Sequence, residues 1–331
     1  MRKVGRIRDV AKETGLSVAT VSRVMNNAGN VRAETRKRVL SACEKLDYLP
    51  NPAARALSTK RTKTVAAIIP TIEHSVFAKY INAIEKALNT RGYSLVLAIS
   101  NADRKEEFDA ARKLIGMGAD AFILSGADHE AEMLKLFNRR NIPYVYTSIW
   151  DPDCENSTIG YDNFELARKA VEYLVSCGHQ KIAAVHGPLA ESDRTHARKA
   201  GAQAFKSSAT SIDFFECELS VSGGKSISKS ILSRKNEYTA ILCFSDVLAM
   251  GAYFCCQEMN VKIPDEISIM GFDNLEWSQH IVPALTTIDL PAADMGRSVA
   301  DELMDHLESG NPIAPNQLFG RILKRGSVSK I

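Results

Sequence analysis

From Thr64 onward, apolar runs of strand length alternate with stretches of helical pattern, and this alternation constrains the fold more than any other feature. The strand-like runs are VAAIIP (65–70), SLVLAIS (94–100), AFILSG (121–126), PYVYTS (143–148), IAAVHG (182–187), FFECEL (214–219), AILCFS (240–245) and ISIMGFD (267–273). The helical stretches cover 77–91, 106–117, 131–139, 163–177, 194–208, 224–233 and 246–259. Strands that are apolar throughout are typical of parallel sheets covered by helices on both faces. There are too many for one small sheet, so we predict an α/β core (64–331) of two doubly wound lobes. The boundary is expected near 148–161, and the chain should cross back near 274–294.

The N-terminal part of the chain follows a helical pattern instead. In IRDVAKETGLSVATVSR (7–23), two short helical patterns flank Gly15, Leu16 and Ser17. Gly15 suits the left-handed backbone that ends a helix, and Ser17 can cap the helix that follows. A third helix is expected over 33–46, with an apolar stripe of Val39, Leu40, Cys43 and Leu46. The pattern is typical of a helix-turn-helix domain over residues 1–48, whose second helix enters a DNA major groove. An ordinary helical hairpin is the alternative.

Charge is distributed unevenly along the chain. Residues 1–63 contain fifteen Lys and Arg but five Asp and Glu, a net charge of +10, whereas the remainder carries 27 basic and 34 acidic residues. A basic N-terminal domain (the head) attached to an acidic remainder indicates that only residues 1–63 are attracted to DNA phosphates. Binding of this head to DNA should weaken steeply as the salt concentration rises.

Residues 49–63 read as a hinge between head and core. Pro50 and Pro52 stop the preceding helix, and 53–58 would form a helical segment too short to be stable alone. We expect this segment to order only when DNA and a second copy of the chain pack on it. Leu57 is then a candidate wedge for a minor-groove base step, the alternative being a plain linker with one exposed leucine.

In open parallel sheets, ligands bind beyond the carboxyl ends of the strands. Here those ends offer apolar walls at Phe77 and Tyr161 and polar groups at Arg198, Ser245, Asp246 and Asp273. An Arg–Asp pair with an aromatic face suits a small hydroxylated or heterocyclic ligand. Each polar residue also has a structural alternative: Asp246 as a helix cap, Asp273 as a turn residue and Arg198 as a surface residue.

The sequence gives little support to catalysis, metal binding or membrane insertion. It contains no Gly-x-Ser-x-Gly, His-Glu-x-x-His or Walker loop, and the isolated His74, His179 and His186 are expected to be structural or solvated. The seven cysteines form no Cys-x-x-Cys pair, which favours reduced thiols. No apolar run is long enough to cross a bilayer, and the N-terminus has no signal core, so we expect a cytoplasmic protein with no cofactor and no metal.

Several segments together resemble the lactose-repressor (LacI/GalR) family of bacterial transcription regulators. They are IRDVAKETGLSVATVSRVMN, VRAETRKRVLSACEKLDYLPNPAARAL, KAVEYLVSCGHQKIA, FSDVLAMGA, IPDEISIMGFDN and PALTTIDLP, in this order along the whole chain. The resemblance implies a DNA-binding head, a hinge helix and a core like the periplasmic sugar-binding proteins. It also implies a homodimer that reads a pseudo-palindromic double-stranded operator. No apolar heptad follows Arg325, so a dimer is expected instead of a tetramer.

The resemblance also implies roles for individual residues in DNA binding. The family's recognition positions match Val18, Ala19 and Arg23, its backbone contacts match Ser17, Thr20 and Ser22, and its hinge leucine matches Leu57. Asn26 and Arg55 complete the predicted DNA-binding set.

For the effector, the family's Arg-x-x-Gly matches Arg198 with Gly201, and its Gly-Phe-Asp matches Asp273. Ser245 stands where relatives often have Asn, before Asp246, and the pocket walls match Val76, Phe77 and Tyr161. The loop 190–197 is unusually charged, and 214–222 offers Glu218 and Leu219 where relatives often have a stacking aromatic, so a sugar acid is a candidate beside a neutral sugar.

We therefore predict a regulator, most simply a repressor, controlled by a small carbohydrate-like effector. A family member acting as an activator and a solute-binding protein of transport are the alternatives. The latter would need an export signal and no basic head. A sugar-modifying enzyme is a third class, which lacks any paired acid–base motif here.

Overall fold

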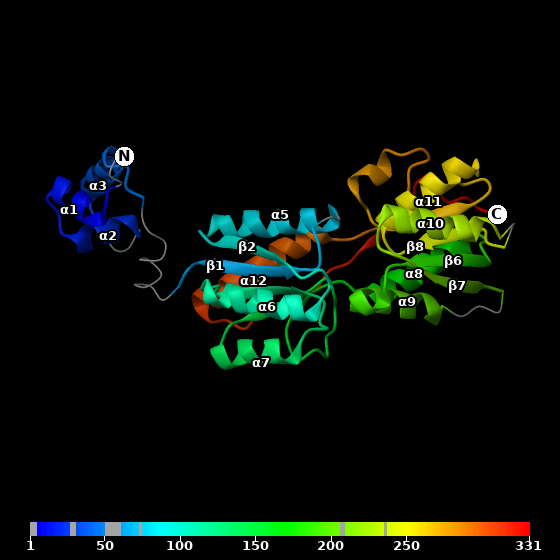
Figure 1. Cartoon of the computed structure of the whole chain (residues 1–331), viewed down its shortest axis with the longest axis horizontal. Coiled ribbons are helices and arrows are strands. Elements are labelled where there is room, and N and C mark those ends of the chain that lie inside the picture. The colour runs from blue at the N-terminus through cyan, green and yellow to red at the C-terminus, as the bar shows by residue number, and fades with distance from the viewer. Residues whose placement is uncertain (1–4, 27–30, 50–60, 73–74, 206–208, 235–236) are drawn as a thin grey trace. The chain divides into compact units, whose positions relative to one another are not determined.

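A computed structural model describes residues 5–26, 31–49, 61–72, 75–205, 209–234 and 237–331 (Figure 1). The chain divides into two compact units, residues 1–63 and 64–331. The predicted hinge segment with Arg55 and Leu57, the loop 27–30 and His74 lie outside the described residues. Within the described ranges, no helix is long and apolar enough to span a membrane.

The described part of the first unit contains three helices, α1 (Ile7–Thr14), α2 (Val18–Met25) and α3 (Ala33–Lys45). Their shared core consists of Val10, Ala11, Val21, Val24, Val39, Ala42 and Cys43. Leu16, in the turn, also packs against this core. Leu40 does not: it is 44% exposed, because it follows Val39 on the helix and so points about 100° away from the buried stripe.

The first lobe of the second unit is a parallel sheet with the strand order β11-β5-β4-β3-β1-β2. Its strands are β1 (Thr64–Ile69), β2 (Ser94–Ile99), β3 (Ala121–Ser125), β4 (Tyr144–Thr147), β5 (Thr158–Gly160) and β11 (Asn316–Gln317). Its helices are α5 (Ser75–Thr90), α6 (Arg104–Gly116), α7 (Ala131–Arg140) and α12 (Ala292–Ser309). Helix α5 covers one face of the sheet and α6 and α7 the other (Figure 1).

The second lobe has the same architecture, with the strand order β12-β10-β9-β8-β6-β7. Its strands are β6 (Lys181–His186), β7 (Ser211–Glu216), β8 (Ala240–Cys243), β9 (Ser268–Asp273), β10 (Thr286–Asp289) and β12 (Arg321–Leu323). Its helices are α8 (Asn163–Ser176), α9 (Asp193–Ala204), α10 (Val221–Leu232) and α11 (Asp246–Met259). Strand β12 is antiparallel to β10, whereas the other pairs are parallel.

Alternation of side chains along each strand explains why both faces of the sheets are buried. Along β1, Val65 and Ala67 enter the core beneath α5 and α12, whereas Ala66 and Ile68 enter the core beneath α6 and α7. All six residues of β9 are buried in the same two-sided manner. The predicted fold class, a helical head followed by two doubly wound lobes, is confirmed.

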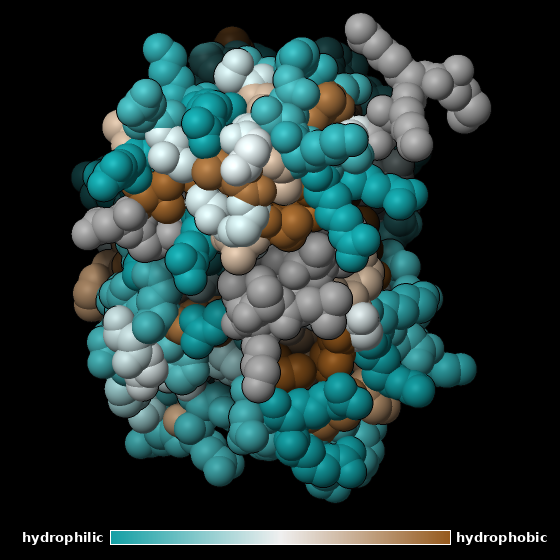
Figure 2. Space-filling model, turned by 90° about the vertical axis from the view of Figure 1, so that its left-hand side faces the viewer, coloured by the Kyte–Doolittle hydropathy of each residue, from teal (hydrophilic) through white to brown (hydrophobic). Residues whose placement is uncertain are grey.

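The described chain passes between the lobes near 161–162, 290–291 and 318–320. The last passage was not predicted from the sequence, and no element was predicted at β5, β10, β11, β12 or α12. It also places the strand FFECEL too late, since β7 ends at Glu216. Large hydrophobic side chains remain exposed in scattered places, including Leu97, Ile99 and Phe254. Figure 2 shows a face dominated by hydrophilic residues, with hydrophobic residues in small groups.

Candidate functional site

The turn between α1 and α2 is built as the sequence predicts. Gly15 ends α1 with a φ angle of 63°, in the left-handed region that favours glycine. The Ser17 hydroxyl caps α2 by accepting a hydrogen bond from the Thr20 backbone N–H at 3.1 Å, and it lies 2.9 Å from the Thr20 hydroxyl. Because Val21 and Val24 are buried in the core of the head, the opposite face of α2 is exposed.

That outer face of α2 carries the predicted recognition residues. Val18 is 41% exposed, and Ala19 and Arg23 are exposed as well. Ser22 and Asn26 are half-buried and bonded to each other, because the Asn26 amide donates to the Ser22 hydroxyl at 3.3 Å. The described part of α2 therefore presents one apolar–cationic surface of the kind that contacts base edges and thymine methyl groups.

A cavity of about 300 Å³ lies between the two lobes of the second unit. The first lobe (lobe 1, which includes α12) contributes a mainly apolar wall that includes Val76, Phe77, Tyr80 and Met295, and it faces the second lobe (lobe 2). The other side is mainly polar and comes from the carboxyl ends of the lobe 2 strands and from α9. Of the seven predicted effector-binding residues, six line this cavity: Val76, Phe77, Tyr161, Arg198, Ser245 and Asp273.

Arg198, on α9, is the buried cation of the cavity, with 8% of its surface exposed. Its Nε donates to Asn163 Oδ1 at 3.0 Å and one terminal nitrogen donates to the Phe244 carbonyl at 2.5 Å. The guanidinium lies 3.9 Å from the centre of the Phe272 ring. Burial lowers the pKa of Arg198 and the nearby Asp273 carboxylate opposes this, but a guanidinium stays charged in proteins. The alternative of a solvated surface arginine is therefore wrong.

Asp273 supplies the matching carboxylate at the end of β9. Its Oδ1 lies 3.9 Å from the Arg198 guanidinium, and its Oδ2 accepts a hydrogen bond from the Ser245 hydroxyl at 2.8 Å. Burial raises the pKa of Asp273, and Arg198 counteracts part of the rise. Its φ angle is 119°, which is strained for a residue with a Cβ. Such strain is often stored where a side chain must face a ligand.

Asp246 is the exception among the predicted cavity residues. It is fully buried behind the cavity, where its carboxylate accepts from the Leu275 backbone N–H at 2.8 Å and the Thr287 hydroxyl at 2.6 Å. The structure thus corrects the prediction that Asp246 offers a polar group to the cavity. It does not cap α11 either, since Ser245 takes that role by accepting from the Val247 N–H at 3.3 Å.

Two models of known families match the chain. The model of "Periplasmic binding proteins and sugar binding domain of LacI family" matches residues 62–317, and that of "Bacterial regulatory proteins, lacI family" matches residues 6–51. The chain belongs to the LacI family. Members of this family are DNA-binding transcription regulators and not enzymes, so this chain is a transcription regulator with a helix-turn-helix head.

Individual LacI-family relatives match nearly end to end. The transcriptional repressor PurR of Klebsiella pneumoniae strain 342 is 29% identical over 330 residues, which is 98% of this chain and 96% of PurR. The regulator RegA of Clostridium acetobutylicum is 33% identical over 88% of this chain and 89% of its own. A crystal structure of the Lac repressor dimer bound to operator and an anti-inducer aligns with a TM-score of 0.86 and 25% identity. It covers 99% of this chain and 100% of that one.

Three residues at or next to the cavity of this LacI-family chain were not predicted from the sequence. Ser148 and Met295 line the cavity, and Asn163 lies directly behind Arg198. Ser148 is the residue after β4, but the predicted strand PYVYTS (143–148) includes it as its last residue, so Ser148 was not counted among the residues beyond the strand end. Met295 belongs to the unassigned helix α12, whose apolar residues at helical spacing do carry a signal. Asn163 has no local signal, because its role depends on residues 15 and 35 positions away.

The buried histidines have structural surroundings. His179 Nδ1 lies 2.9 Å from the Thr239 hydroxyl and His186 Nδ1 lies 2.8 Å from the Gly187 carbonyl. Burial lowers the pKa of both, which favours neutral rings at neutral pH. Among the described residues, no group of three or more His, Cys, Asp or Glu side chains could hold a metal ion.

Proposed function

We propose that this LacI-family regulator is a cytoplasmic repressor that binds a pseudo-palindromic operator as a homodimer. In this proposal, a small carbohydrate-like effector occupies the cavity between the lobes and controls DNA binding. Effector binding changes the angle between the lobes and so the spacing of the two hinge segments. The observation that carries the proposal is the buried pair of Arg198 and Asp273 facing an apolar wall across the cavity.

The chemistry of the cavity supports a hydroxylated ligand. Sugar hydroxyl groups can donate to the Asp273 carboxylate and accept from the Arg198 guanidinium, while the ring's C–H faces pack on Phe77 and Val76. A volume of about 300 Å³ is at the small end of ligand pockets. Glu191, Arg194 and Glu218 also line it and extend the candidates to sugar acids. Structures similar in fold are described as holding ribose or cellobiose.

The outer face of α2 supports sequence-specific DNA contact through the major groove. Arg23 can donate two hydrogen bonds to a guanine, and Val18 and Ala19 can contact thymine methyl groups. Arg32, Lys37 and Arg38 are exposed on α3 and its N-terminal side, where they can reach phosphates. For residues 53–58, with Arg55 and Leu57, the proposal of a hinge helix in the minor groove rests on the family resemblance.

An exposed sheet edge supports the homodimer. Strand β2 lies at the edge of the lobe 1 sheet, and none of its residues is fully buried. Leu97 and Ile99 on this strand are 40% and 41% exposed. Apolar side chains on an uncovered edge favour association with another chain.

Titration of candidate effectors into an operator-binding assay tests the proposal. The full chain is bound to labelled operator DNA, and D-ribose, cellobiose, D-gluconate and D-glucuronate are added in turn. At least one should change the operator Kd by about 5- to 150-fold, the usual range of allosteric coupling. A fall in affinity identifies an inducer, and a rise identifies a co-repressor. If no sugar or sugar acid changes the Kd, the proposed effector class is wrong.

The variant Arg198→Ala is the control for the site. It removes the buried cation of the cavity, so the response to the active sugar should be lost while operator binding without effector stays within about threefold of wild type. Loss of operator binding as well would show that Arg198 serves only the fold. The activator alternative is tested by transcription in vitro from a promoter next to the operator, where a repressor lowers and an activator raises transcript yield.

A further inference from the structure

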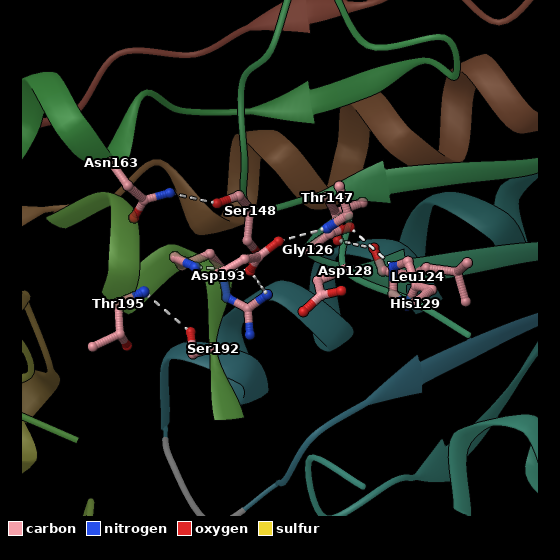
Figure 3. Close-up of polar contacts among 12 residues, drawn as sticks. Leu124, Gly126, Asp128, His129, Thr147, Ser148, Asn163, Ser192, Asp193 and Thr195 are labelled. Carbon is pink, nitrogen blue, oxygen red and sulfur yellow. Dashed lines mark hydrogen bonds and ion pairs between the residues drawn. The ribbon is translucent and has the colours of Figure 1, made fainter. Parts of the chain in front are cut away.

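Asn163 joins the cavity's arginine to the backbone of the other lobe. The residue is 3% exposed and occupies the first position of α8. On one side its Oδ1 accepts a hydrogen bond from Arg198 Nε at 3.0 Å. On the other side its Nδ2 donates to the Ser148 carbonyl at 2.8 Å, a contact drawn in Figure 3. Arg198 belongs to lobe 2 and Ser148 directly follows strand β4 of lobe 1, so one amide bridges the two.

The partners determine which way this amide faces. Arg198 Nε can only donate, so it requires the amide oxygen. The carbonyls of Ser148 and Tyr161, at 2.8 Å and 3.4 Å from Nδ2, can only accept, so they require the amide nitrogen. Only a side chain with a donor and an acceptor of this size satisfies both sides. Capping of α8 does not explain it, because Asp162 caps that helix by accepting from the Glu165 N–H at 2.9 Å.

Close packing holds the lobe 2 end of this bridge. Gly201 on α9 lies against the Phe164 backbone, where a Cβ at Gly201 would be 2.0 Å from the Phe164 carbonyl oxygen. Helix α9, which carries Arg198, is therefore in backbone contact with the residue that follows Asn163. A movement of Arg198 cannot be absorbed by free sliding of α9 along α8.

The lobe 1 end is held in an uncommon conformation. Ser148 has a φ angle of 65°, in the left-handed region, and its N–H points at the Met295 sulfur at 3.2 Å. Both residues line the cavity. The Ser148 carbonyl, which accepts a hydrogen bond from Asn163, therefore lies in space between the end of β4 and the first turn of α12. This position is next to a passage of the chain between the lobes.

We propose that Asn163 is a positioning residue that transmits occupancy of the cavity from Arg198 to the lobe 1 backbone at Ser148. Asn163 does not line the cavity itself. When a ligand draws the guanidinium of Arg198, Oδ1 of Asn163 follows, and Nδ2 of the same amide pulls on the Ser148 carbonyl. The inference rests on the proposed effector function for its ligand, but the bridge itself can be tested without one.

The variant Asn163→Asp separates the two halves of the bridge. One carboxylate oxygen still accepts from Arg198 Nε, now with opposite charge. The other oxygen replaces the amide nitrogen and faces the carbonyls of Ser148 and Tyr161, so both donated hydrogen bonds are lost. Asn163→Ala removes both halves. Asn311→Asp makes the same chemical change at an exposed position and is the matched control.

The first experiment uses amide hydrogen exchange of the full chain without ligand. In Asn163→Asp, exchange over 146–150 should rise at least fivefold, while exchange over α9 stays at the wild-type rate. In Asn163→Ala, both segments should exchange faster, and in Asn311→Asp neither should change. The bridge is refuted if Asn163→Asp leaves 146–150 unchanged or loosens α9 to the same extent.

The second experiment uses whichever of D-ribose, cellobiose, D-gluconate and D-glucuronate binds the wild type by calorimetry. Asn163→Asp should bind that sugar within about threefold of the wild-type Kd, yet the sugar should change its operator Kd less than twofold. A merely structural asparagine would lose sugar binding and response together, and that result would overturn the proposal, as would a full response. If no sugar binds wild type, the proposed effector class fails, and the hydrogen-exchange experiment still decides the bridge.

Discussion

At the scale of single residues, two buried carboxyl groups, one at the start of α11 and one at the end of β9, have separate roles. Asp273 faces the cavity and Arg198, whereas Asp246 lies behind it and holds the Leu275 N–H and the Thr287 hydroxyl. Burial, and then the neighbouring Asp273, raises the pKa of Asp246 to about 7 from an ordinary value of 3.8. Of these two carboxyl groups, Asp246 has the higher pKa and is therefore the more easily protonated near neutral pH.

Replacement of Asp246 by asparagine should change the pH dependence of stability. Because the pKa of Asp246 is higher in the folded chain than in the unfolded chain, this group stabilises the fold at low pH, and that contribution is lost as pH rises from about 4 to about 7. Asparagine does not titrate. The wild type loses about 2.6 kcal/mol of this contribution between pH 5 and pH 8, so the Tm of Asp246→Asn relative to wild type should rise over that range by on the order of 5–10 °C.

Thermal unfolding at pH 5, 6, 7 and 8 measures this difference. Asp265→Asn, at an exposed position, serves as the control for the loss of one carboxylate. A constant difference in Tm between Asp246→Asn and wild type across the four pH values would contradict the assigned cause.

At the scale of elements, the head depends on packing and caps because its helices are short. Helices α1 and α2 have eight residues each, a length at which an isolated helix is marginal in water. Their stability comes from the shared valine core and from the turn, where Gly15 ends one helix and Ser17 begins the next. The surface proposed to contact bases is therefore only as rigid as this turn.

Removal of the cap should loosen the recognition helix. Ser17→Ala deletes the oxygen that accepts from the Thr20 N–H, a change that costs about 1 kcal/mol at helix N-termini. Hydrogen exchange over 18–25 in the full chain should become about fivefold faster. Ser17→Asn supplies another good capping side chain and should restore most of the protection. Equal protection in Ser17→Ala and wild type would mean that the valine core alone orders α2.

The elements also mark how far the sequence could be interpreted. Strong local signals predict α2 and α11 within their observed bounds, because caps and apolar periodicity lie in the same few residues. Strand β5 has three residues and β11 two, too short for any periodicity to appear. Helix α12 does have apolar residues at helical spacing, such as Met295, Val299 and Leu303, so the sequence contains the signal for this helix.

The site was predictable to the extent that strand ends converge. Parallel strands place Arg198, Ser245 and Asp273 near one edge of the lobe 2 sheet, as the sequence analysis predicts. Whether a carboxylate there faces the cavity or the protein interior depends on tertiary packing, which is why Asp246 was placed wrongly. The bridge through Asn163 joins residues of two lobes and leaves no trace in local pattern.

At the scale of the whole second unit, two hydrogen bonds between described residues join the lobes besides the Asn163 bridge. Lys79 of lobe 1 donates to the Asn274 carbonyl of lobe 2 at 2.9 Å. Asp193 of lobe 2 accepts from the Ala127 N–H of lobe 1 at 2.7 Å, and Figure 3 shows Asp193 beside Gly126. Gly126 permits this approach, because a Cβ there would lie 2.7 Å from Asp193 Oδ1. Separation of the two lobes at these positions requires the Lys79–Asn274 and Ala127–Asp193 hydrogen bonds to break.

Weakening the Asp193 contact should therefore favour opening of the lobes. A hydrogen bond to a charged group contributes about 1.5–3 kcal/mol, so Asp193→Ala should speed hydrogen exchange of the Ala127 amide by about tenfold or more. Asp193→Asn keeps an acceptor oxygen without the charge and should have a smaller effect. The order of wild type, Asn and Ala separates geometry from charge, since a purely electrostatic contact would make the two variants equal. If Ala127 stays as protected in Asp193→Ala as in wild type, this hydrogen bond does not hold the lobes together, and closure depends on Lys79 and Asn163.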